Sequence, residues 1–175
     1  GHQGGGRAQA RRRPPPAAGA HVAACDPEFR PMVEAALQSG ARYSTITRFR
    51  VRDFEPESNT IYMQRPKGGN AGKVIYLTDE GTEFFKRACA GRGKNDLIFT
   101  RKDGSQWKAS QQLRPMKEAV KNARIETPIT FHGLRHSCAT LLIREGGPQL
   151  LLTISRFLGH SSQSVTETTY IHLLK

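Results

Sequence analysis

The sequence predicts an α+β fold that is mainly helical and contains one small antiparallel three-stranded sheet. Apolar residues recur at helical spacing in several segments, each bounded by Gly, Pro or a capping residue. Segments rich in β-branched and aromatic residues cluster instead between residues 51 and 77, where a Gly-rich turn separates two of them. The chain has 175 residues, 37% of them hydrophobic, which is enough to bury one core of ordinary size.

The N-terminal stretch differs in composition from the rest of the chain. Residues 1–24 are mostly Gly, Arg, Pro and Ala, with almost nothing to bury. Such a composition is typical of disordered tails and linkers. We therefore predict a tail at residues 1–24 and one folded domain at residues 25–175.

The folded domain is expected to open with a helix. Asp26 is a suitable N-cap, Pro27 a suitable first helical residue and Gly40 a suitable C-terminal stop. The apolar stripe between them comprises Phe29, Met32, Val33, Ala36 and Leu37. This spacing predicts a helix that packs one face against the core.

The sheet and a second helix are expected next. The strand candidates are residues 51–54, 60–64 and 73–77, and the glycines at 68–72 would close a hairpin between the last two. Thr78, followed by two acidic residues, is a suitable N-cap for a helix that carries Phe84, Phe85 and Ala88.

Beyond this helix, the pattern alternates between short breaks and further helices. Ile98–Phe99 reads as a short buried stretch and Asp103–Gly104 as a turn. Helices are expected at about 110–124, 133–145 and 150–158. Pro115 is either the first residue of its helix or the cause of a kink, and the pattern leaves both open.

Charge and cysteine usage restrict the class of protein. The net charge is +12, which suggests a polyanionic partner such as nucleic acid, although a solvated basic surface explains the charge equally well. Three widely spaced cysteines form no Cys-x-x-Cys pair, so neither a disulfide framework nor a zinc site is expected. No apolar run is long enough for a membrane span or a secretory signal, so we expect a cytoplasmic protein.

Two basic side chains stand one turn apart near the start of the helix predicted at 133–145. His132 and Arg135 lie opposite its apolar side, which contains Leu134, so both are expected to point away from the core toward an anion such as phosphate. Alone, the pair is more often a solvated basic face. A metal site formed by His132 and His136 is rejected, because the Glu of a His-Glu-x-x-His motif is missing and Arg135 would repel a cation.

Further motifs precede and follow this pair. They are Ser39-Gly-Ala-Arg42, Arg65-Pro-Lys-Gly-Gly69, Leu158-Gly-His160 and the Tyr170–His172 segment. In this order, the motifs resemble those of the tyrosine recombinases, or phage integrase family, over roughly residues 26–175. A nucleotide-binding P-loop at 68–73 is rejected, because the glycines are out of register and a strand follows instead of a helix.

The resemblance implies the DNA breaking-rejoining fold of integrase catalytic domains and a mechanism in which Tyr170 attacks a DNA phosphate. A 3′-phosphotyrosine and a free 5′-hydroxyl would result. Because an ordinary tyrosine has a pKa of about 10, it needs activation at neutral pH. By the same resemblance, His132 accepts the phenol proton and Lys67 protonates the leaving 5′-oxygen.

The remaining positions that match the family pattern bind the phosphate. Arg42 and Arg135 would clamp its non-bridging oxygens, and His160 would donate a further hydrogen bond. By the same resemblance, no metal is expected to be needed, because these side chains supply the positive charge. Neither ATP nor any other cofactor is expected, because the phosphotyrosine would store the energy of the broken bond for rejoining. The family usually has an acidic residue three positions after the first arginine, and this chain has Thr45 there.

The resemblance also implies a biological setting. The partner would be double-stranded DNA and the active form a homotetramer on paired sites. We expect this sequence to lack the N-terminal core-binding domain of full members. Two alternatives remain: a catalytically degenerate integrase remnant that only binds DNA, for which Thr45 and slightly longer motif spacings argue, and an enzyme like the type IB topoisomerases.

Overall fold

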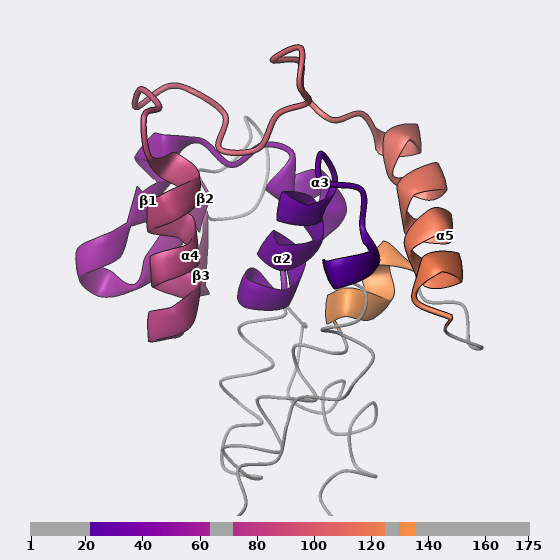
Figure 1. The fold of residues 1–175 in the computed structure, drawn as a ribbon. Coiled ribbons are helices and arrows are strands. Elements are labelled where there is room, and N and C mark those ends of the chain that lie inside the picture. The colour runs from indigo at the N-terminus through magenta and orange to yellow at the C-terminus, as the bar shows by residue number, and fades with distance from the viewer. Residues whose placement is uncertain (1–21, 64–71, 125–129, 136–175) are drawn as a thin grey trace, which may run out of the picture.

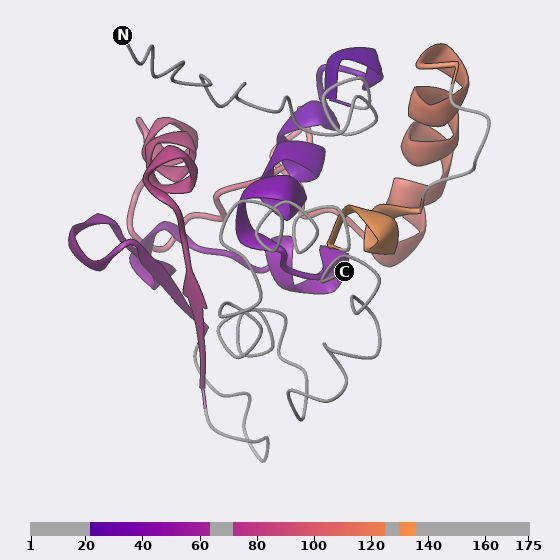
Figure 2. The same ribbon diagram turned by 90° about the horizontal axis from the view of Figure 1, so that it is seen from below.

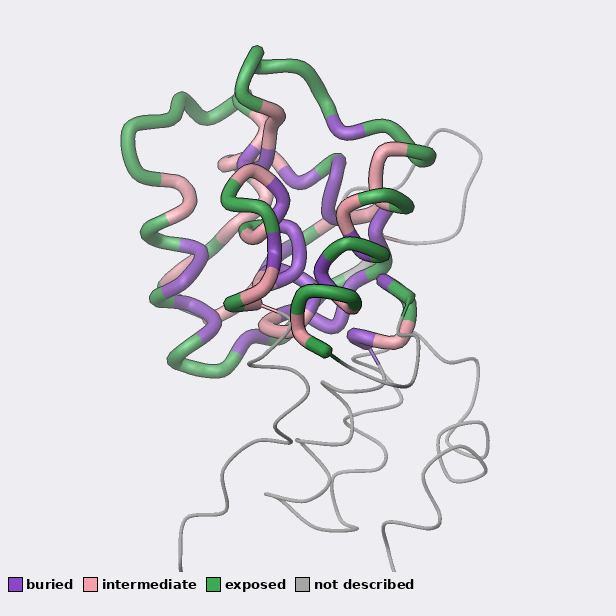
Figure 3. Tube along the Cα trace, turned by 45° about the vertical axis from the view of Figure 1, so that its right-hand side comes forward, coloured by how far each residue is buried: buried purple, intermediate pink, exposed green. Residues whose placement is uncertain are grey.

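A computed structural model describes residues 22–63, 72–124 and 130–135 of the chain. Helix α2 (Arg30–Ser39) lies in the middle, with the sheet and helix α4 (Asp79–Cys89) on one side and helix α5 (Leu113–Asn122) on the other (Figure 1). Buried residues follow the inward sides of these elements, and exposed residues follow the outward sides (Figure 3). No helix among the described residues combines the length and apolarity needed to cross a bilayer.

Helix α2 ends where the sequence predicts and begins later. Gly40 closes it with a left-handed backbone (φ 64°), and its N–H donates to the Ala36 carbonyl at 2.8 Å. The predicted start at Pro27 is wrong, because the helix begins at Arg30. The Asp26 carboxylate instead accepts the Glu28 N–H at 2.8 Å, which closes a local turn before the helix.

The chain contacts the core slightly before the predicted domain boundary. Val22 packs against the buried cluster, and its carbonyl accepts a hydrogen bond from Arg30 Nε at 3.1 Å. Cys25 is buried, and this burial raises the pKa of its thiol to about 11. The folded part of the chain therefore includes residues 22–24, which were expected to belong to the tail; residues 1–21 lie outside the described residues.

A one-turn helix, α3 (Tyr43–Ile46), follows closely after α2. Its N-cap is Arg42, whose backbone is extended (φ −69°, ψ 153°). The sequence does not predict this helix, since four residues are too few to show a helical period. Two of its members, Tyr43 and Ile46, are nevertheless buried.

The three strands form an antiparallel sheet in the order β1-β2-β3, as predicted. They are β1 (Phe54–Glu55), β2 (Thr60–Met63) and β3 (Lys73–Tyr76). A short 3₁₀ turn, η2 (Pro56–Ser58), joins the first two. The register pairs Ile61 with Ile75, and both side chains are buried on the face toward the core.

The first strand is shorter than expected, because residues Val51–Asp53 form a 3₁₀ turn, η1, instead of a strand. The Asp53 carboxylate accepts the Arg50 N–H at 2.9 Å, which closes this turn. The Val51 and Arg52 N–H groups donate to the carbonyls of Asp96 and Lys94. These distant acceptors replace a strand ladder, and the local β pattern at 51–54 does not reveal them.

Helix α4 confirms its predicted cap and core residues. The Thr78 hydroxyl accepts the Gly81 N–H at 3.0 Å, and acidic residues occupy the first turn. Phe85 is fully buried at the centre of an aromatic cluster. Its ring centroid lies 5.2–6.0 Å from those of Phe84, Phe99, Phe54 and Phe49.

The segment between α4 and α5 also follows the predictions. Ile98 and Phe99 are buried, and a turn at Asp103–Gly104 has Gly104 at φ 82°. A 3₁₀ turn, η3 (Ala109–Gln112), then leads into α5. Pro115 is the third residue of α5, where its missing N–H costs no helical hydrogen bond, so it neither begins nor kinks the helix.

Candidate active site

The helix that carries His132 and Arg135 begins at Phe131, two residues before the predicted start. The Thr130 hydroxyl and carbonyl both accept the Gly133 N–H, at 3.3 and 3.0 Å, which closes its first turn. Figures 1 and 2 place this short helix between α2 and α5. The predicted continuation beyond residue 135 and the helix at 150–158 lie outside the described residues.

Aromatic packing docks this helix on the first part of the domain. The Phe131 ring meets Tyr43 edge to face, with centroids 5.1 Å apart and planes at 80°. Its centroid lies 6.1 Å from that of Phe29, just before α2. Leu134 is also buried. The first turn of the helix is therefore fixed against α2 and α3.

Arg135 is buried, which corrects the expectation that it points away from the core. Its side chain is only 5% exposed, and its Nε donates to the Gly40 carbonyl at 2.6 Å. That carbonyl belongs to the C-terminal end of α2, where carbonyl groups lack helical partners and carry partial negative charge. A tertiary contact thus holds a guanidinium that the helical pattern assigned to the outer face.

Arg42 lies two residues after the carbonyl that binds Arg135. Its own carbonyl accepts the N–H groups of Thr45 and Ile46, both at 3.0 Å, while its side chain is exposed. Two residues span at most about 7 Å, so the backbone of Arg42 is close to the Arg135 guanidinium. Within the described ranges, no hydrogen bond or ion pair engages the Arg42 guanidinium.

His132 is exposed on the first turn of the same helix that buries Arg135. The structure therefore brings three of the predicted site residues to one region: Arg42, His132 and Arg135. Two permanent positive charges and an imidazole at one place suit the binding of a phosphate group.

The other predicted site residues, Lys67, His160 and Tyr170, lie outside the described residues. In sequence, Lys67 falls between Met63 and Lys73, which pair with each other across β2 and β3. In the parts of the chain that the structure describes, no three His, Cys, Asp or Glu side chains gather as a metal site would require.

Tyr43 is a residue of this region that the sequence did not single out. It is 7% exposed, and its hydroxyl donates to the Lys108 carbonyl at 2.7 Å. Burial raises the pKa of its phenol to about 12, against an opposing effect of the positive Arg101. The sequence signal for Tyr43 was its position directly after the motif arginine, Arg42. Aromatic residues that only pack in the core are common at such positions too, so this signal does not identify a site residue.

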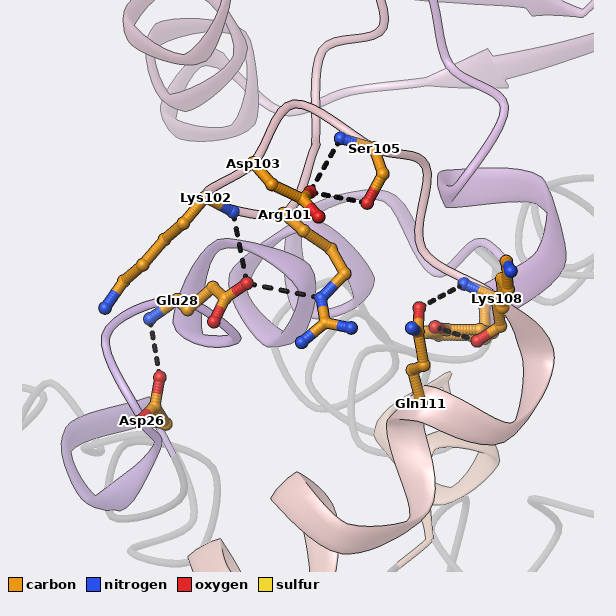
Figure 4. A network of polar contacts seen from close by, with 9 residues as sticks. Asp26, Glu28, Arg101, Lys102, Asp103, Ser105, Lys108 and Gln111 are labelled. Carbon is orange, nitrogen blue, oxygen red and sulfur yellow. Dashed lines mark hydrogen bonds and ion pairs between the residues drawn. The ribbon is translucent and has the colours of Figure 1, made fainter.

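A polar network holds the segment that provides this carbonyl. Glu28 Oε1 accepts from Arg101 Nε at 3.3 Å and from the Lys102 N–H at 3.1 Å (Figure 4). The Arg101 guanidinium lies 5.2 Å from the centroid of Trp107, a cation–π contact. The segment that leads to Lys108 is thus fixed to the residues just before α2.

Comparison with known proteins shows the family to which the chain belongs. The family model described as "Phage integrase family" matches residues 21–175. This chain belongs to the phage integrase family. The resemblance that the motifs predicted is thereby confirmed.

One curated relative of this integrase family member is a tyrosine recombinase XerD from Halalkalibacterium halodurans. It is 32% identical over 114 residues, which are 61% of this chain and 37% of the relative. The chain therefore spans well under two thirds of that relative's length.

Solved structures show the same fold. The XerA recombinase crystal structure matches with a TM-score of 0.70 and 22% identity, over 87% of this chain and 57% of the other. The Tn1549 transposon integrase, solved in complex with circular intermediate DNA, also matches with a TM-score of 0.70, at 19% identity over 89% of this chain and 61% of the other. The integrase-like, mainly helical α+β fold with its small sheet is confirmed.

Proposed function

We propose that this chain carries the catalytic domain of a site-specific DNA recombinase, which cleaves and rejoins duplex DNA through a 3′-phosphotyrosine. The observation that carries the proposal is the hydrogen bond from Arg135 to the Gly40 carbonyl. Arg42 and Arg135 are 93 positions apart in the sequence, and this bond brings both motif arginines to the C-terminal end of α2. The family and the DNA-bound Tn1549 relative support the same activity.

The proposed reaction needs no group beyond the side chains. The Tyr170 oxygen attacks phosphorus while its proton passes to His132, and the bond to the 5′-oxygen breaks as Lys67 protonates that oxygen. The phosphotyrosine conserves the energy of the broken bond, so a 5′-hydroxyl reverses the step without ATP.

Phosphate binding would fall to the remaining site residues. Arg42, Arg135 and His160 would contact the non-bridging oxygens, whose charge grows in the transition state, so loss of one donor typically costs about 10²–10³ in rate. The Gly40 carbonyl already holds the Arg135 side chain in place, whereas the Arg42 side chain is exposed and accessible to a DNA strand.

The proposal extends to the setting of the reaction. The substrate would be double-stranded DNA in the cytoplasm, where the free thiols of Cys25 and Cys89 are expected to stay reduced. Subunits would act as a tetramer on paired sites, as the family resemblance implies. The catalytic domain would cover the chain from about residue 22 onward, preceded by a tail.

Covalent capture of DNA tests the activity. The whole chain is incubated with a pool of nicked duplexes of randomised sequence, in which cleavage at the nick releases a short 5′-hydroxyl strand and traps the adduct. We expect an adduct that survives denaturation and disappears in Tyr170→Phe. Tyr76→Phe is the matched control, because this phenol on β3 is 55% exposed and should be dispensable.

The outcomes separate the alternatives. Absence of any adduct, together with salt-sensitive DNA binding that Tyr170→Phe leaves intact, would contradict the recombinase proposal and support a degenerate DNA-binding remnant. Adducts without sequence preference, with relaxation of supercoiled plasmid, would instead support an enzyme like the type IB topoisomerases.

A further inference from the structure

We infer that Tyr43 is a positioning residue, which fixes the turn that presents Arg42 and joins it to the helix that carries His132 and Arg135. The inference rests on the proposed function for its catalytic consequence. Its structural part rests on the contacts of one buried side chain.

The hydroxyl of Tyr43 connects α3 to a segment far along the chain. It donates to the Lys108 carbonyl at 2.7 Å, across 65 sequence positions. A second bond joins the same two regions, since Gln106 Nε2 donates to the Thr47 carbonyl at 3.0 Å. One hydrogen bond thus leaves each end of α3 for the segment 106–108, which the Glu28 network in turn holds in place (Figure 4).

The ring of Tyr43 connects α3 to the other half of the site. Its centroid is 5.1 Å from that of Phe131, which directly precedes His132. The helix that contains Phe131 makes a second contact with this region, because its Arg135 side chain donates to the carbonyl of Gly40, two residues before Arg42. Tyr43 and Arg135 therefore form two parallel links between the Arg42 turn and the His132 helix.

The other contacts around the Arg42 turn are local or apolar: the Ala41 N–H donates to Ser39 Oγ at 3.2 Å, and Ala41 and Ile46 are buried. Helix α3 has only four residues, too few to be stable without tertiary contacts. Among the described residues, neither Arg42 nor Thr45 makes a side-chain hydrogen bond or ion pair. The position of the Arg42 backbone is consequently set by its neighbours, and Tyr43 is the neighbour with both a polar and an aromatic tertiary contact.

The test removes only the hydroxyl, with Tyr43→Phe in the whole chain. In the covalent capture assay, under single-turnover conditions, we expect adduct formation to slow about 10–100-fold while DNA affinity changes little, because a displaced phosphate-binding group affects the chemical step. In an Arg42→Ala background, the same substitution should cost less than about 3-fold, since residues that act through one another are not additive. Tyr76→Phe is again the control.

Amide hydrogen exchange provides a readout that needs no DNA. The N–H groups of Thr45 and Ile46 bond to the Arg42 carbonyl, so we expect both to exchange about 10-fold faster in Tyr43→Phe. The Phe85 amide in α4 is the internal reference and should keep its wild-type rate.

Each other result overturns the inference. Three results would show that Tyr43 does not position Arg42. They are an unchanged rate of adduct formation in Tyr43→Phe, an equally large effect of Tyr43→Phe on this rate in the Arg42→Ala background, and unchanged amide exchange at Thr45 and Ile46. Parallel acceleration at Phe85 would show a general loss of stability instead of a local role. If the wild-type chain forms no adduct, the proposed function fails, and the exchange rates alone decide whether Tyr43 fixes the turn.

Discussion

Arg42 and Arg135 carry the same chemical group in opposite environments. Arg135 is buried and held by a helix-end carbonyl, whereas the Arg42 side chain is exposed. A guanidinium suits the buried place, because its fork can bond to a carbonyl through Nε while its other nitrogens face elsewhere. The same fork, when exposed, suits capture of a phosphate from solution.

Arg135→Lys tests the value of this fork, because it keeps the charge and removes the Nε donor. We expect the free energy of unfolding to fall by about 1–2 kcal/mol, since the buried Gly40 carbonyl loses a charged partner. Adduct formation should fall about 100-fold or more. Urea unfolding measures the change in stability, and covalent capture measures the change in the rate of adduct formation. If both the free energy of unfolding and this rate stayed unchanged, the role given to the bond between Arg135 and the Gly40 carbonyl would be contradicted.

At the scale of elements, the end of α2 organises the candidate site. Gly40 ends the helix in the left-handed region, and the chain then turns directly into α3. This conformation leaves the Gly40 carbonyl accessible to Arg135 and places Arg42 two residues later. A glycine suits the position because a side chain in the left-handed region costs about 1–2 kcal/mol.

Gly40→Ala should therefore destabilise the domain by about 1 kcal/mol and also slow adduct formation, because the carbonyl and the turn after it shift together. Gly104→Ala is a matched control: its φ is 82°, in an exposed turn with open space around the added methyl. We expect a similar loss of stability there, seen by urea unfolding, with adduct formation unchanged. Equal activity in the two variants would contradict the role assigned to the α2 end.

For the whole molecule, excess positive charge is the dominant electrostatic property. The net charge is +12, and the ion pairs among the described residues, Lys86–Glu83, Arg101–Glu28 and Arg114–Glu118, engage only a small part of its cations. Such a surface favours a polyanion and makes its binding depend on salt.

The affinity for duplex DNA should thus fall linearly on a plot of log K against log salt concentration. Arg42→Ala should reduce the magnitude of the slope by about one, because one phosphate contact is lost. Lys86→Ala should leave the slope unchanged, since its ammonium is paired with Glu83 at 3.0 Å. Fluorescence anisotropy over a salt series measures both, and equal slopes for all three proteins would exclude Arg42 from the DNA contact.

Local patterns by themselves determined much of this protein. The cap at Thr78, the stop at Gly40, the three-stranded sheet and the family motifs were all predictable, because each depends on residues close together in sequence. The catalytic roles of all six site residues stay predictions, and Lys67, His160 and Tyr170 also lie outside the described residues.

Tertiary structure alone decided how the described part of the site is held. The burial of Arg135 depends on a carbonyl 95 positions away, and the role inferred for Tyr43 depends on one 65 positions away. The turn at Val51–Asp53 likewise depends on acceptors at residues 94–96. Helical and strand periodicities describe only which residues share a face, whereas the partner of a buried polar group is set by how distant segments pack.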